Sequence, residues 1–145
     1  MKIPAYIQTT RAQNIGRICL GLFMLTAGIG HLSFARVALQ AQVPDWVPFT
    51  KDFTVVASGY VEIALALSLL FVKRYRVFVG IGLGIFFILI FPGNLEQYTK
   101  HKDMPGLDND TARLIRLFFQ PVLIWLALWS TGAIKALNAK FRMHN

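Results

Sequence analysis

Four long runs of apolar residues dominate the chain. They cover residues 14–34, 53–72, 77–98 and 112–133. Each is long enough to cross a bilayer as a helix, which takes about 20 residues. The runs are continuous and do not alternate between apolar and polar positions, so they do not fit the strands of a membrane barrel. The pattern therefore predicts an all-α fold, in which residues 1–145 form a single membrane domain, a bundle of four transmembrane helices.

The first run has an alternative interpretation. Lys2, Arg11 and Arg17 precede its apolar core, as basic residues precede the core of a cleaved signal peptide. The run extends beyond signal-peptide length, however, and no clear A-x-A cleavage site follows it. We therefore expect it to be a membrane span, with the guanidinium of Arg17 reaching the membrane surface.

The composition agrees with a membrane protein. Hydrophobic residues make up 55% of the 145 residues, and charged residues make up only 15%. A soluble domain usually has about a quarter charged residues, so this chain lacks the polar surface that a water-facing globule needs. The single cysteine, Cys19, excludes both an internal disulfide and a CxxC redox pair.

The lysines and arginines predict the orientation of the bundle. Nine of them lie in the N-terminal segment, the link between the second and third spans, and the C-terminal tail, against six on the other side. The positive-inside rule therefore places both termini in the cytoplasm. The net charge of +8 follows from this topology, so it gives no reason to expect a nucleic acid as partner.

Glu62 is the one acidic residue in the middle of a predicted span. A charge at the centre of a bilayer costs about 2.5–3.5 kcal/mol on insertion scales, so this carboxyl group should face the interior of the bundle. Val55, Ser58, Gly59 and Ala66 share its helical face, and the small residues among them leave space beside it.

The other unusual polar residues fall at the same depth. His31 is near the end of the first span, Asn94 is near the end of the third, and Arg116 and Gln120 are at the start of the fourth. In the predicted topology, all of these segments belong to the outer half of the bundle. We therefore expect these side chains to gather around Glu62.

Two prolines support this expectation. Pro92 cannot donate a hydrogen bond to the carbonyl of Ile88, and Pro121 cannot donate one to the carbonyl of Leu117. Carbonyls freed at membrane depth are tolerated where protein or trapped water satisfies them. Two such breaks at similar depth predict a polar half-cavity toward the outer side of the bundle.

These polar residues also have purely structural interpretations. Glu62 can form a buried ion pair with Arg116 or His31 that holds the helices in register. His31 can hydrogen-bond a backbone carbonyl, Arg116 can extend to the outer headgroups, and Asn94 can cap a broken helix. The sequence contains no metal motif, because Met24 and Cys19 do not have the spacing of a ligand set with His31.

Two further segments allow predictions about helix packing and about position in the membrane. Gly80 and Gly84, four residues apart in the third run, form a small-residue face suited to close helix contact. The stretch 35–52 contains two prolines around Trp46, and we expect it to lie at the level of the lipid headgroups.

Four segments together resemble the signature segments of the DoxX-like membrane proteins. By position, His31, Glu62, Asn94 and Arg116 match the polar residues of that family. The resemblance covers nearly the whole chain in the right order, and it implies a multi-pass protein of the bacterial inner membrane. The segments are TAGIGHL at 26–32, SGYVEIALAL at 58–67, FPGNLEQY at 91–98 and RLFFQPVLIWLALW at 116–129.

The resemblance also implies a function. Some DoxX-like proteins are described as the membrane subunit of a quinone-reducing thiosulfate oxidoreductase, which implies here a quinone-binding subunit of a thiosulfate- or sulfur-linked redox system. In this hypothesis Glu62 and His31 are catalytic and relay protons. The quinone-binding residues are Asn94, Arg116, Gln120 and Tyr60. Because the sequence has no haem or flavin motif, the electrons would come from a soluble partner protein.

A second hypothesis stays open. The chain can be a non-enzymatic membrane protein that binds a lipid or small hydrophobic solute in its cavity, or that acts as a scaffold for a soluble partner. A third possibility, transport, would require a homo-oligomer, because four helices in one chain are few for a pathway. The sequence alone does not decide whether the protein is an enzyme.

Overall fold

The computed structural model describes residues 2–102 and 109–145. Four long helices have bounds within three residues of the predicted spans, and all four are apolar enough to cross a membrane. The described ranges contain no strand, so the predicted all-α bundle of four membrane helices is confirmed. The long helices are α1 (Arg11–Leu32), α2 (Lys51–Phe71), α3 (Arg76–Thr99) and α4 (Asp110–Ser130), with a 3-10 helix η1 (Ala38–Gln42) after α1 and a short helix α5 (Ala133–Arg142) after α4.

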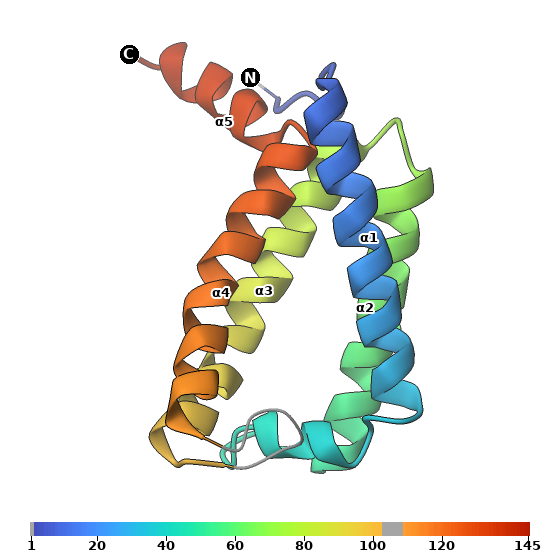
Figure 1. The fold of residues 1–145 in the computed structure, drawn as a ribbon. Helices are drawn as coiled ribbons and strands as arrows, with labels where there is room; N and C mark the ends of the chain where they lie inside the picture. The colour runs from blue at the N-terminus through green and yellow to red at the C-terminus, as the bar shows by residue number, and fades with distance from the viewer. Residues whose placement is uncertain (1, 103–108) are drawn as a thin grey trace.

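The four long helices form two antiparallel pairs (Figure 1). Helix α1 packs along α2, and α3 packs along α4. The pairs meet at the end of the molecule that holds both termini, which we call the terminal end. They diverge toward the opposite end, the loop end, where residues 33–50 link α1 to α2 and also contact α3 of the other pair. We call this segment the η1 loop.

The apolar core lies where the two pairs meet. Each long helix contributes two buried side chains, so the core joins both pairs into one bundle. Among the described residues this core does not extend into the half where the pairs diverge. The core residues are Leu20 and Met24 of α1, Ala66 and Leu69 of α2, Leu83 and Phe87 of α3, and Leu123 and Ala127 of α4.

Glycines allow the close approach of helices within each pair. A Cβ atom added to Gly59 would lie 2.6 Å from the Cβ of His31 and 3.1 Å from the carbonyl oxygen of Gly28, so α1 and α2 need a glycine there. Gly80 faces Thr131, and Gly84 faces Leu128. The small-residue face predicted in the third span is therefore used against α4 and its C-terminal end within the chain.

Arg17 is buried at the terminal end, so the prediction that it reaches the membrane surface is wrong. Its side chain donates a hydrogen bond of 2.6 Å from Nη1 to the carbonyl oxygen of Leu69. Leu69 lies in the last turn of α2, where helix carbonyls lack partners along the chain. An acceptor within reach inside the bundle therefore competes successfully with the membrane surface.

Gly132 sets the direction of the last helix. Its φ of +80° lies in the left-handed region that glycine adopts most easily, and it separates α4 from α5. Helix α5 consequently leaves the bundle at an angle across the terminal end (Figure 1). Ala133 and Ala136 hold it there, because both are fully buried in a small cluster with Val77 of α3.

Candidate functional site

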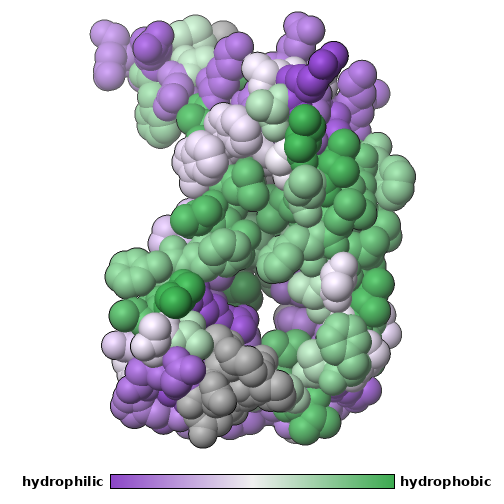
Figure 2. Space-filling view, viewed as in Figure 1, coloured by the Kyte–Doolittle hydropathy of each residue, from purple (hydrophilic) through white to green (hydrophobic). Residues whose placement is uncertain are grey.

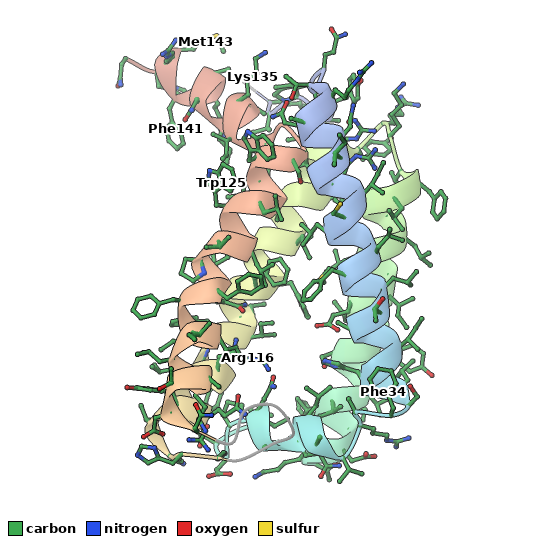
Figure 3. The ribbon with its side chains drawn as sticks, in the orientation of Figure 1. Phe34, Arg116, Trp125, Lys135, Phe141 and Met143 are labelled. Carbon is green, nitrogen blue, oxygen red and sulfur yellow. The ribbon has the colours of Figure 1, made fainter. Side chains whose placement is uncertain are left out.

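The divergence of the helix pairs leaves two adjoining cavities in the half of the bundle near the loop end. The larger, of about 450 Å³, lies between α1 and α4. The smaller, of about 190 Å³, lies between α2, α3 and the η1 loop. His31, Glu62 and Arg116 line both cavities, so these three side chains stand where the cavities meet. Figure 3 shows Arg116 projecting from α4 into the space between the pairs.

The predicted half-cavity is therefore present, and the structure adds how it opens. Figure 2 shows a hollow in the face between α1 and α4, with hydrophilic residues inside it and hydrophobic residues above it. Leu39 of the η1 loop lines both cavities, and Gln42 lines the smaller one. The loop thus covers the loop end, and the larger cavity opens sideways between helices that face the membrane.

Glu62 and His31 form the closest pair of ionisable groups in the site. The Nε2 atom of His31 lies 3.5 Å from the Oε2 atom of Glu62, which is long for a hydrogen bond. Glu62 is only 5% exposed. Its Oε2 atom is buried and has no hydrogen-bond partner among the described residues.

The opposite side of the His31 ring fixes its tautomer. The Nδ1 atom lies 2.9 Å from Ser58 Oγ and 3.2 Å from the carbonyl oxygen of Val55. A carbonyl oxygen can only accept, and Ser58 Oγ already donates to the same carbonyl, so we assign the ring proton to Nδ1. In the neutral ring, Nε2 is then an acceptor that faces Glu62, ready to take a proton from it or from a ligand.

Arg116 links the site to the η1 loop. Its Nη2 atom donates a hydrogen bond of 2.8 Å to Oε1 of Gln42. The loop approaches α3 at the same place, because a Cβ atom added to Gly93 would be too close to the carbonyl oxygen of Gln42. The glycine of the FPGN segment therefore lets the loop backbone lie directly on α3.

Asn94 and Gln120 form a buried amide pair between α3 and α4. Asn94 Nδ2 donates to Gln120 Oε1 at 3.2 Å, and Gln120 Nε2 donates to the carbonyl oxygen of Phe87 at 2.8 Å. Asn94 lines the smaller cavity and Gln120 the larger one. Both helices continue through their prolines, Pro92 and Pro121. The carbonyl that Gln120 reaches lies about one turn before Pro92.

Five of the six predicted site residues line the cavities: His31, Glu62, Asn94, Arg116 and Gln120. The structure does not bring Tyr60 to them. Its side chain is 64% exposed and lines neither cavity. The reason is helix geometry, because residues two apart on a helix point in nearly opposite directions, and Glu62 points inward.

Two further residues belong to the site. Ser58 orients His31, and Gln42 binds Arg116. Ser58 could have been found from the sequence, because it lies one turn before Glu62 on the same face of the helix. No comparable signal exists for Gln42, because the path of a connecting loop does not follow from hydrophobic periodicity.

A cluster of charges fixes the η1 loop to the long helices. Asp45 accepts hydrogen bonds of 2.9 Å from Lys51 at the start of α2 and from Lys100 just after α3. Lys100 also pairs with Glu96 of α3. The hydrogen bonds from Lys51 and Lys100, with the nearby charge of Lys102, hold the pKa of Asp45 well below its ordinary range. The loop is thus tied to both helix pairs.

Comparison with known proteins identifies a family. One family model, described as Domain of unknown function (DUF8561), matches residues 20–131, which contain every residue of the site. No curated protein and no solved structure matches the chain. Among the described residues, no group of three His, Cys, Asp or Glu side chains is placed to hold a metal ion.

Proposed function

The chain belongs to the DUF8561 family, and from the geometry of its site we propose that it binds the polar head of a lipophilic molecule within the membrane. One observation carries the proposal. Glu62 Oε2 is buried, has no hydrogen-bond partner among the described residues, and lies at the junction of the two cavities. A buried polar atom without a partner is costly, so a ligand gains affinity by donating a hydroxyl to the Glu62 carboxylate or by accepting the O–H of protonated Glu62.

The shape of the larger cavity supports a lipophilic ligand. Its volume of about 450 Å³ is within the range of about 300–1,000 Å³ for ligand pockets. Its outer walls include the aromatic rings of Phe23 on α1 and Phe119 on α4, both about half exposed on membrane-facing surfaces. A ligand can therefore place its polar head beside Glu62 and leave its tail between these helices in the lipid.

A quinone is the ligand class we propose, in keeping with the resemblance to DoxX-like proteins of the bacterial inner membrane. Reduction of a quinone to a quinol takes up two electrons and two protons. In this proposal Glu62 and His31 pass protons to the quinone oxygens, while Arg116 donates a hydrogen bond to one of them. The electrons come from a soluble redox partner, in a thiosulfate- or sulfur-linked system.

A purely structural role for Glu62 is less well supported by the contacts. Its nearest ionisable partner, His31, is on the neighbouring helix of the same pair, and Asn94 and Gln120 likewise join helices of one pair. These contacts do not tie the two pairs together across the cavity. A structural ion pair would also be expected to satisfy both carboxylate oxygens.

Thermal unfolding of the purified protein with a short-chain quinone tests this proposal. We expect the quinone to raise the unfolding temperature of the wild type. Arg116→Gln should weaken binding about tenfold or more, because a hydrogen bond to a charged donor is lost. Glu62→Gln keeps the shape of the side chain, so it should leave quinone binding measurable but abolish quinone reduction by the reconstituted complex.

Tyr60→Phe is the matched control on the same helix. It should leave both binding and reduction unchanged, because Tyr60 points away from the cavities. If no quinone shifts the unfolding temperature, and none copurifies with the protein in mild detergent, quinone binding is rejected. If Glu62→Gln binds and supports reduction as well as the wild type, the catalytic role of Glu62 is rejected.

A further inference from the structure

A separate groove lies at the terminal end, in the corner between α5 and the end of α4. Its volume is about 590 Å³. Helix α5 contributes Lys135, Asn138 and Arg142 to its lining, α1 contributes Gln13, and α4 contributes Trp129. This groove shares no lining residue with the two cavities at the other end of the bundle.

The sequence of α5 places its polar side chains together. Lys135, Asn138 and Arg142 are spaced i, i+3 and i+7, so they share one face of the helix. Ala133 and Ala136 occupy another face, which is buried against the bundle. The groove therefore receives two cationic side chains from a helix that is anchored by its alanines.

The positive charge in the groove is not neutralised by the protein. Lys135 and Arg142 are exposed, and in the part of the chain that the structure describes neither forms an ion pair. The sequence explains why, since it has no acidic residue before Asp45 or after Asp110. An anion at this site would meet cations without competition from a carboxylate.

The wall below the groove is apolar and aromatic. Trp129 and Trp125, one turn apart on α4, stack with their ring centroids 5.1 Å apart. Trp125 is half exposed and projects from α4 on the side below α5, as Figure 3 shows. Tryptophan is enriched where the hydrocarbon core meets the headgroups, so this wall lies at the depth where acyl chains begin.

The geometry points to a binding site for one anionic phospholipid. The phosphate of the lipid is held by Lys135 and Arg142, and Asn138 donates a further hydrogen bond to it. One acyl chain runs along the stacked indoles of Trp129 and Trp125. Cationic groups above an aromatic wall match a charged headgroup above a hydrocarbon chain, which neither a free phosphate nor a soluble anion has.

Quenching of tryptophan fluorescence by brominated lipids tests this site. The chain has three tryptophans, and Trp46 lies in the η1 loop at the other end, so Trp46→Phe leaves only the pair beside the groove. This protein is reconstituted in bilayers in which either phosphatidylglycerol or phosphatidylcholine carries bromine on its acyl chains. We expect brominated phosphatidylglycerol to quench several-fold more efficiently at equal mole fraction.

The double substitution Lys135→Gln and Arg142→Gln should make the quenching by the two lipids nearly equal, because each cation near the headgroups adds to the attraction for an anionic lipid. Lys73→Gln with Arg74→Gln is the matched control, because it removes two exposed cations from the same end of the bundle but outside the groove. All four side chains are exposed, and helical circular dichroism checks that each variant folds. The proposal is rejected if the two lipids quench the Trp46→Phe protein equally. It is also rejected if both double variants lose the same share of the preference.

Discussion

Several buried side chains have a polar atom without a hydrogen-bond partner in the described ranges, and Glu62 is the one among them that lines the two cavities. Arg17 reaches a backbone carbonyl, and Asn94 and Gln120 bond to each other. Glu62 Oε2 has no such partner in the described ranges. Buried polar groups are normally hydrogen-bonded, so one that lacks a hydrogen bond beside a cavity marks the place where a ligand is expected.

Substitution of Gly93 tests the contact between the η1 loop and α3. In Gly93→Ala the new methyl group would press on the backbone carbonyl of Gln42, which cannot move aside as a side-chain tip can. We expect a loss of stability of about 1–3 kcal/mol, as for overpacked cores, and a weaker contact between the η1 loop and α3. Unfolding in mixed micelles measures the change.

Gly82→Ala, in the same helix, is the control for this substitution. Nothing lies within 4 Å of a Cβ atom added there, so this change should be neutral or stabilise the helix by up to about 1 kcal/mol. Equal effects of the two substitutions would mean that the loop does not depend on Gly93.

The sequence predicts whether a side chain faces the interior of the bundle where helical periodicity decides this. Glu62, His31 and Asn94 face the interior as predicted, because a polar group in an apolar span has few other places to go. Tyr60 can tolerate the lipid face, so its presence near Glu62 in the sequence carried no information about direction. Arg17 was predicted incorrectly because the nearby carbonyl of Leu69 is a tertiary feature.

Among the elements, the η1 loop has the greatest influence on the site. It covers the cavities, supplies Gln42 and is held by charges on either side. The hydrophobic runs predicted the long helices within three residues, but they say nothing about how a link of this kind lies on them. Helix α5 was missed for a related reason, because it is short and only partly apolar.

The attachment of the η1 loop should depend on pH through Asp45. Its pKa is lowered in the folded protein, so the ionised form contributes stability that is present above the ordinary value of 3.8 and is lost as the pH falls below it. Asp45→Asn should therefore unfold at a lower temperature than the wild type at pH 7. The difference should begin to shrink below about pH 4 and keep shrinking as the pH falls toward the lowered pKa of the folded protein, because the unfolded wild type takes up the proton before the folded one does.

Thermal scans of the two proteins over this pH range measure the effect. High salt should also reduce the difference at pH 7, since the groups are exposed and their interaction is screened. A difference that stays constant from pH 7 down to about pH 2 would show that the charge of Asp45 does not hold the loop.

For the whole molecule, the important feature is that the two helix pairs are joined at one end and diverge at the other (Figure 1). The core fills the joined half, and the cavities fill the diverging half. The sequence predicted the contents of that half, because the polar residues gather at one depth. It could not predict the sideways opening, which depends on how far the pairs separate.

Ala27 is placed to test this opening. It lines the larger cavity on α1, and Ala27→Trp should fill the space between α1 and α4. If ligands enter there, a long-tailed quinone should bind about tenfold more weakly, while a short-chain quinone should be affected less. Leu22→Trp, on the exposed surface of the same helix and outside both cavities, should change neither. Equal weakening of long- and short-tailed ligands would indicate another route.

The η1 loop, which covers the loop end, lies between the cavities and any soluble protein that docks there. A soluble protein that docks on this side meets the η1 loop and cannot touch whatever occupies the cavities. Arg116 connects the cavities to the loop, since it lines both cavities and holds Gln42. If the proposed ligand draws the guanidinium toward itself, we expect the loop to loosen, so that a soluble partner docked on it would respond to whether the cavity is filled.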